Sequence, residues 1–175
     1  MRLLVILFGM VISCQAVFIP ADLAALQVAV NSCISETPDG SCPNFAASND
    51  ATGNPHGVIG DWDISQVTSL KRLFKSSKHF NSDLSSWDVS NVINMEDTFN
   101  ECYVFTSDLS SWNTSKVTNM KQTFKYTRAF NSDLSAWDVS KVTTFWGTFA
   151  YAEVFTSDLS SWDVSKSTSF YYMFK

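Results

Sequence analysis

The sequence predicts an α/β repeat solenoid, a coil of stacked rungs in which each rung forms one short strand and one short helix. Three observations lead to this fold class. A tryptophan returns every 25 residues and carries a whole sequence frame with it. Apolar residues in each frame follow first the strand period and then the helix period. One frame is too small to bury a core alone, so neighbouring frames must stack. The repeated tryptophans are Trp62, Trp87, Trp112, Trp137 and Trp162.

Residues 1–16 are predicted to be a secretory signal peptide. An apolar run from Leu3 to Ile12 follows a basic residue, and small residues precede an expected cleavage after Ala16. The run is shorter than the roughly 18 apolar residues of a membrane-spanning helix, and no second run follows, so no transmembrane segment is expected. A lipoprotein signal is the alternative, with Cys14 acylated as the new N-terminus.

Residues 17–60 depart from the repeat and are predicted to cap its first rung. After Pro20, the spacing of Leu23, Leu26 and Val30 places them on one face of a helix. Such a cap would cover the apolar cross-section and the unpaired edge that the end of a repeat stack exposes.

The cysteines agree with an oxidising compartment. Cys33 and Cys42 bracket a turn-rich segment after the expected helix, at a spacing that a disulfide can close. Cys102 occupies a repeat position that takes small residues elsewhere, so we expect it to be a buried free thiol.

Residues 61–175 form the repeat, with four full rungs and one partial rung. In the second copy Trp87 and Val89 alternate with a polar residue, as in a half-buried strand. Val92, Met95 and Phe99 then recur at the spacing of one helical face. The serine between the two patterns is a candidate helix N-cap in each copy; these serines are Ser65, Ser90, Ser115, Ser140 and Ser165.

The fifth copy stops halfway, at Lys175. We therefore expect the chain to be a fragment. The alternative is self-association that covers an open C-terminal edge.

The segment LSSWDVSNVINMEDTFNECYVF, from Leu84 to Phe105, resembles the repeat of BspA-like leucine-rich-repeat surface proteins. The phrases WDVSxVTxM and FNSDLSSW resemble the 25-residue variant of bacterial surface lipoproteins and secreted algal proteins. The resemblance extends over residues 58–175 and implies a leucine-rich-repeat-like extracellular solenoid that is adhesive or of unknown role. It brings no catalytic residues.

Composition argues against two function classes. The formal net charge is −5 and we see no basic stripe, so nucleic acid is not an expected partner. Only two histidines occur, His56 and His79, and nothing marks a base and an acid converging on a nucleophile. We therefore expect no enzymatic activity and no cofactor.

Polar ladders recur with the repeat. One contains Asp63, Asp88, Asp138 and Asp163, interrupted by Asn113, and the other contains Asp83, Asp108, Asp133 and Asp158. Aspartate beside serine is typical of turns, and the alternative is a calcium site that would support calcium-dependent adhesion. Asn113 also begins an Asn-Thr-Ser sequence, which is an N-glycosylation acceptor in a eukaryotic host.

The varied positions of the repeat suggest both register control and recognition. Charges of opposite sign fall on adjacent rungs, as at Lys71 and Glu96, so we expect neighbouring rungs to form ion pairs. Trp146 and Tyr151 are the candidate partner-binding residues; the alternative is that Trp146 only packs on the next rung.

The function expected is a secreted or cell-surface protein that binds an extracellular protein or polysaccharide, and the alternative is a self-assembling wall or matrix component.

Overall fold

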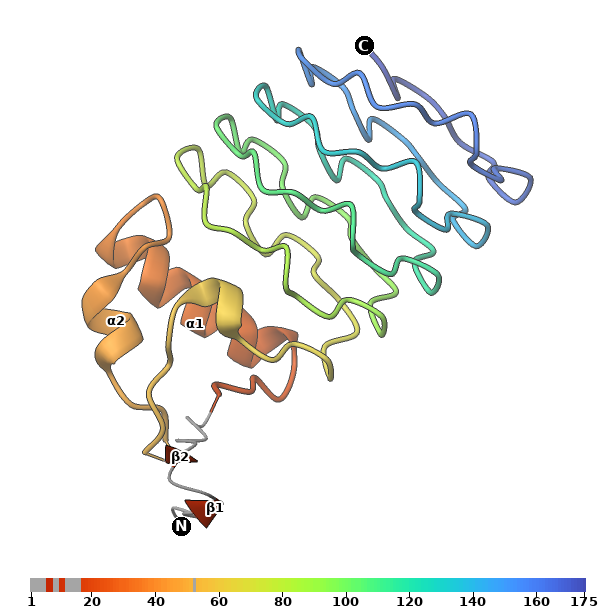
Figure 1. Ribbon diagram of the computed structural model, residues 1–175. Helices are drawn as coiled ribbons and strands as arrows, with labels where there is room; N and C mark the ends of the chain where they lie inside the picture. The colour runs from red at the N-terminus through yellow and green to blue at the C-terminus, as the bar shows by residue number, and fades with distance from the viewer. Residues whose placement is uncertain (1–5, 8–9, 12–16, 52) are drawn as a thin grey trace.

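The computed structural model describes residues 6–7, 10–11, 17–51 and 53–175, and Figure 1 shows a helical N-terminal part beside a stack of rungs. Strands β1 (Ile6–Leu7) and β2 (Met10–Val11) pair in antiparallel register. Most of the predicted signal peptide, including the acylation candidate Cys14, lies outside the described residues.

Helix α1 (Leu23–Glu36) packs against the first rung. Its N-cap is Asp22, whose carboxylate accepts a hydrogen bond from the Ala25 N–H at 2.9 Å. Leu26 and Val30 are buried in the common core. On the same side, the Gln27 side-chain amide donates to the Leu73 carbonyl of the first rung at 3.0 Å.

Two further short helices complete the N-terminal part. Helix α2 (Pro43–Ala47) follows the disulfide between Cys33 and Cys42, the pair that the sequence predicts. The Glu36 carboxylate at the end of α1 accepts hydrogen bonds from the Asn44 and Phe45 N–H groups, so α1 caps α2. A 3-10 helix (Ile59–Asp61) then leads into the first tryptophan.

The prediction of one strand and one helix in every rung is wrong. Over residues 62–175 the structure has no helix, and strand-like pairing is reduced to single parallel bridges such as Ser69 with Asn94. The serines proposed as helix N-caps therefore have no helix to cap. Each rung is a flattened loop built from consecutive turns, and the loops stack side by side (Figure 1).

Overlapping turns account for the helix-like apolar spacing. In the first rung the N–H groups of Leu73, Lys75 and Ser77 each bond to the carbonyl three residues earlier. A turn of this kind returns the chain to the same face after three or four residues, as a helix would. Spacing alone therefore does not distinguish a helix from a chain of turns.

The turns leave every second N–H free to reach the next rung. At each junction four N–H groups donate to carbonyls of the following rung, at 2.8–3.2 Å. All of these bonds point toward the C-terminal side of the stack. The donors of the first three complete rungs are Leu70, Arg72, Phe74, Ser76, Met95, Asp97, Phe99, Glu101, Met120, Gln122, Phe124 and Tyr126.

Two positions of the rung adopt left-handed backbone. In the first rung these positions are the third residues of the four-residue turns that begin at Leu70 and at Phe74. A turn of this type requires a positive φ at its third residue. A non-glycine residue there costs about 1–2 kcal/mol, which the packing of neighbouring rungs must offset. The residues are Arg72, Asp97, Gln122, Gly147 and Tyr172 at the first position, and Ser76, Glu101, Tyr126 and Tyr151 at the second.

The core consists of aromatic rows that run through the stack. Phe74 and Phe99 stack with ring centroids 5.4 Å apart, and the same contact repeats at 5.6 Å in later rungs. Each repeat tryptophan is buried. From the third rung on, its indole N–H donates to a carbonyl of an earlier rung, as from Trp112 to Leu84 at 3.0 Å; Trp87 donates to Ile59 in the 3-10 helix at 2.8 Å. Cys102 is a buried free thiol, as expected, and burial raises its pKa.

Candidate functional site

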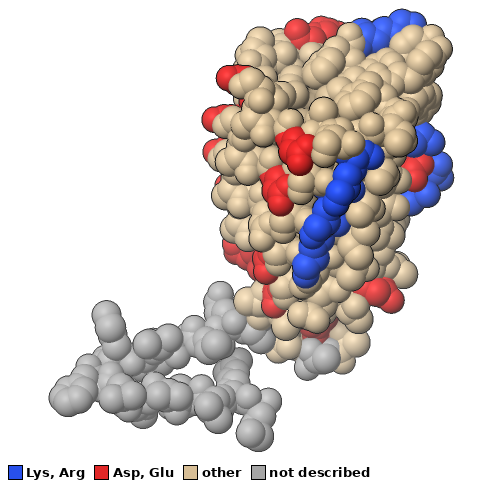
Figure 2. Space-filling view, turned by 90° about the vertical axis from the view of Figure 1, so that its right-hand side faces the viewer, with Lys and Arg blue, Asp and Glu red and all other residues tan. Residues whose placement is uncertain are grey.

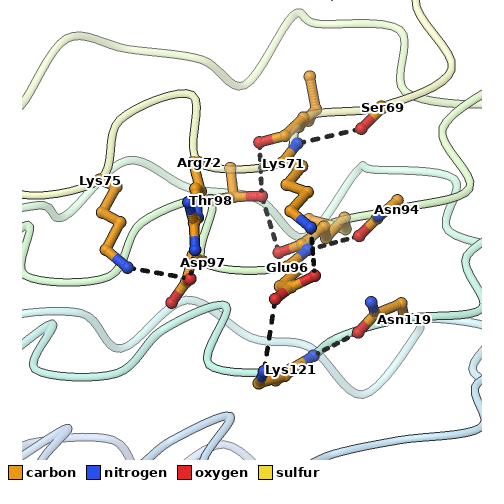
Figure 3. A network of polar contacts seen from close by, with 12 residues as sticks. Ser69, Lys71, Arg72, Lys75, Asn94, Glu96, Asp97, Thr98, Asn119 and Lys121 are labelled. Atoms are coloured by element: carbon orange, nitrogen blue, oxygen red, sulfur yellow. Dashed lines mark hydrogen bonds and ion pairs between the residues drawn. The ribbon is translucent and has the colours of Figure 1, made fainter.

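Ion pairs join the first three rungs on the side of the stack where residues differ between copies, as at Lys71, Glu96 and Lys121. The Glu96 carboxylate lies between Lys71, at 2.9 Å, and Lys121, at 3.4 Å (Figure 3). The next residue, Asp97, forms ion pairs with Lys75 at 3.0 Å and with Arg72 at 3.5 Å. The prediction that neighbouring rungs pair opposite charges is confirmed.

The backbone holds these charged residues in register. The N–H groups of Lys71, Glu96 and Lys121 each bond to a side-chain oxygen two residues earlier, from Ser69, Asn94 and Asn119 respectively. Figure 3 shows these bonds repeating down the stack beside the ion pairs. The hydrogen bond from Lys71 is the main cause that lowers the pKa of Glu96, which keeps this carboxylate charged.

The row of ion pairs ends in an aromatic contact. Lys121, which already pairs with Glu96, has its ammonium group 5.1 Å from the ring centroid of Trp146 in the next rung. This is cation–π distance. Trp146 remains half-buried. It therefore packs on its neighbour and also presents part of its ring to solvent; its role in partner binding stays a prediction.

A small cavity of about 190 Å³ lies beside Trp146. Its lining includes Tyr126 and Tyr151, whose rings stack with centroids 4.5 Å and planes 4° apart. The two candidate partner-binding residues, Trp146 and Tyr151, therefore line one cavity. Gly147 also lines it, and a Cβ atom at this position would lie 3.3 Å from the Gln122 side chain.

Lysine side chains line the cavity, and no Asp or Glu side chain does. Lys125 lies 5.3 Å above the Tyr126 ring, and Lys175 lies 4.4 Å above the Tyr172 ring. Among the described residues, no Asp or Glu lies within ion-pair distance of Lys125 or Lys175. From the sequence, Lys125 is assigned only to the basic charge of the third copy and not to a binding surface. Comparing the fourteenth position of each copy would have shown it beside the aromatic positions.

The aspartate ladders stabilise turns. Asp88 accepts the Ser90 N–H at 2.9 Å, and Asp83 accepts the Ser85 N–H at 2.9 Å. Hydrogen bonds to Ser90 lower the pKa of Asp88. Asn113 makes the same bond to Ser115 at 3.2 Å, and its side chain is exposed. In the part of the chain that the structure describes, no group of three or more His, Cys, Asp or Glu residues could hold a metal ion.

A second basic feature escaped the sequence analysis. Lys116, Lys141 and Lys166 occupy the same position of three consecutive rungs and are all exposed. Their 25-residue period is visible in the sequence, so the statement that there is no basic stripe is wrong. Figure 2 shows Lys and Arg side chains collected in a row along one face of the stack, with acidic residues beside them.

The fold defines a repeat protein of stacked 25-residue rungs, with a small cavity beside Trp146. The chain belongs to the family described as "Mycoplasma protein of unknown function, DUF285", whose model matches residues 44–143 and 110–175. Neither a curated protein nor a solved structure matches the chain. Among the described helices, none has the length and apolar character needed to cross a membrane.

Proposed function

We propose that this protein is a secreted or cell-surface repeat protein of BspA-like type that binds an extracellular protein or polysaccharide and catalyses no reaction. The observation that supports this function is the place of the cavity. Ion pairs join the first three rungs and also connect Arg128 with Glu153. The cavity instead presents aromatic rings beside Lys125 and Lys175, which have no Asp or Glu partner among the described residues.

The aromatic residues suit recognition. Tyrosine and tryptophan supply large, rigid contact surfaces and are enriched among the residues that dominate binding energy. Tyr151 is 38 % exposed, so part of its surface is free for a partner. The stacked Tyr126 ring supports it from the preceding rung, which fixes its orientation before binding.

The test uses the full chain against an array of purified glycans and a panel of purified extracellular proteins. Trp146→Ala and Tyr151→Ala should each weaken binding by about 30-fold, the effect of losing a dominant contact of about 2 kcal/mol. Val154→Ala is the matched control, because Val154 is exposed in the same rung and does not line the cavity.

Two results would count against this function. One is a partner whose affinity is unchanged by both aromatic substitutions. The other is the absence of any partner together with oligomers that grow with protein concentration in light scattering, which would favour the self-assembling wall or matrix component. The N-terminus of the exported protein, read by mass spectrometry, distinguishes cleavage after Ala16 from acylation at Cys14.

A further inference from the structure

We propose that the cavity beside Trp146 binds an anionic sugar ring, so that the partner is an acidic polysaccharide. This inference rests on the proposed binding function and narrows its ligand class. It is carried by three properties of the cavity: its size, its aromatic lining and the lysine side chains around it.

The size and shape suit one ring. The volume of about 190 Å³ is below the roughly 300–1,000 Å³ of sites for drug-sized ligands. Gly147 keeps the space beside Gln122 open, because a side chain there would approach Gln122 closely. Such a cavity accepts a single ring of a polymer whose remaining units stay outside.

The lining suits a sugar. Trp146, Tyr126 and Tyr151 offer flat apolar surfaces on which the C–H face of a sugar ring can pack. The side-chain amide of Gln122 provides both a donor and an acceptor for hydroxyl groups.

The charge suits an anion. Lys125 and Lys175 line the cavity, and no Asp or Glu side chain lies among its lining residues. Lys121, which also pairs with Glu96, stands over Trp146. The chain as a whole carries a formal charge of −5, so this local excess of lysine is opposite in sign to the rest of the molecule. A local positive potential on an acidic protein attracts an anion where the remaining surface repels it.

Calorimetric titration of the full chain tests the proposal with four probes at low salt. Polygalacturonate carries carboxylates, its methyl ester is the same polymer without charge, dextran sulfate carries sulfates, and dextran is neutral. Polygalacturonate should bind at least about tenfold more tightly than its methyl ester. Comparison with dextran sulfate shows whether the anionic group that the site prefers is a carboxylate or a sulfate.

Variants assign the binding to the cavity. Lys125→Gln should weaken polygalacturonate binding about fivefold, the effect of roughly 1 kcal/mol for one exposed charge pair, and leave the methyl ester unaffected. Trp146→Ala should weaken both polymers. Lys141→Gln removes the same charge from the exposed lysine row, outside the cavity, and should have no more than a twofold effect; circular dichroism checks that each variant is folded.

Each opposing result has a distinct meaning. Equal affinity for polygalacturonate and its ester, with both weakened by Trp146→Ala, overturns the anionic ligand and leaves the binding function in place. A larger effect of Lys141→Gln than of Lys125→Gln overturns the cavity as the site. Binding to neither anionic polymer overturns the proposal, and tight binding to a protein of the panel instead would identify a protein partner.

Discussion

Replacing Asp97 with alanine should lower the free energy of unfolding by about 2–4 kcal/mol. The Asp97 side chain is only 3 % exposed and accepts a hydrogen bond from the Asn100 side chain at 2.7 Å. A hydrogen bond to a charged group is worth about 1.5–3 kcal/mol, and losing it would leave a buried amide without its acceptor. The pair with Lys75 adds at most about 1 kcal/mol, because the lysine is partly solvated.

The backbone of Asp97 supplies a second, separable contribution. Its φ is 57°, so glycine at this position releases left-handed strain of about 1–2 kcal/mol and adds about 0.5–1 kcal/mol of unfolded-state entropy. Asp97→Gly should therefore be more stable than Asp97→Ala by about 0.5–1 kcal/mol. Both variants lose the same carboxylate, so their difference isolates the backbone.

Urea unfolding followed by circular dichroism and tryptophan fluorescence measures these differences. If the free energy of unfolding of Asp97→Ala lies within about 0.5 kcal/mol of the parent value, the carboxylate does not stabilise the second rung. If the alanine variant equals or exceeds the glycine variant, the backbone is not strained there.

The pH dependence provides an independent check. Burial acts to raise the pKa of Asp97, but hydrogen bonds from Asn100 and Lys75 and the charges of Lys75 and Arg72 outweigh it, so the pKa lies below its ordinary value. The stabilisation is therefore complete above the unfolded-state pKa of about 4. It should disappear as pH falls through the lower folded-state value, where the parent protein and Asp97→Ala should converge in stability.

Three further predictions concern the stack and its cap. Gly147→Ala should cost about 1–2 kcal/mol, because φ is 64° and the new Cβ would lie 3.3 Å from a neighbouring side chain; unchanged urea unfolding would contradict this. Ser132→Ala should cost about 1–3 kcal/mol, since the Leu109 N–H donates to the Ser132 hydroxyl at 2.8 Å; Ser161→Ala should cost less, because the Ser161 hydroxyl also bonds to another rung but in contact with solvent. Reducing the disulfide between Cys33 and Cys42 should lower stability by about 2–3 kcal/mol, and thermal unfolding with and without reductant measures it.

The repeated apolar positions could be predicted because burial depends on side-chain chemistry. Residues such as Trp87, Met95 and Phe99 are buried whether the backbone between them is helical or turned. The ion pair between Lys71 and Glu96 was predictable for a related reason, because the period places equal positions on adjacent rungs. The buried positions and the ion pair both follow once successive 25-residue copies are stacked in register.

The local backbone could not be predicted in the same way. Helices and consecutive turns share an apolar spacing of three and four residues, so the pattern favoured a helix where turns occur. Positive φ angles are normally signalled by glycine, yet only Gly147 carries this signal, while Arg72, Asp97 and Gln122 adopt the same conformation in other rungs. Hydrogen bonds between rungs impose that backbone, and the residue type at the position does not reveal it.

The candidate site was predicted in part. Trp146 and Tyr151 stand out because the first two copies carry charged or small residues at the same positions. The structure places both at one cavity. Lys125 did not stand out, since lysine on a surface is ordinary. Its meaning depends on the absence of a nearby Asp or Glu side chain, which only the three-dimensional arrangement shows.

Most backbone hydrogen bonds between rungs point in the same direction, which makes the stack electrically polar. Arg72 donates to the Glu96 carbonyl, and the N–H of the same peptide group, that of Asp97, donates to the Lys121 carbonyl. Peptide dipoles therefore align head to tail, as they do in an α-helix. Four columns of peptide groups have this direction, whereas the column that includes Ile93 has the opposite direction. Gln27 donates to the Leu73 carbonyl at the negative end of one column. The cavity lies toward the positive end, where the backbone itself adds to the attraction that the lysines exert on an anion.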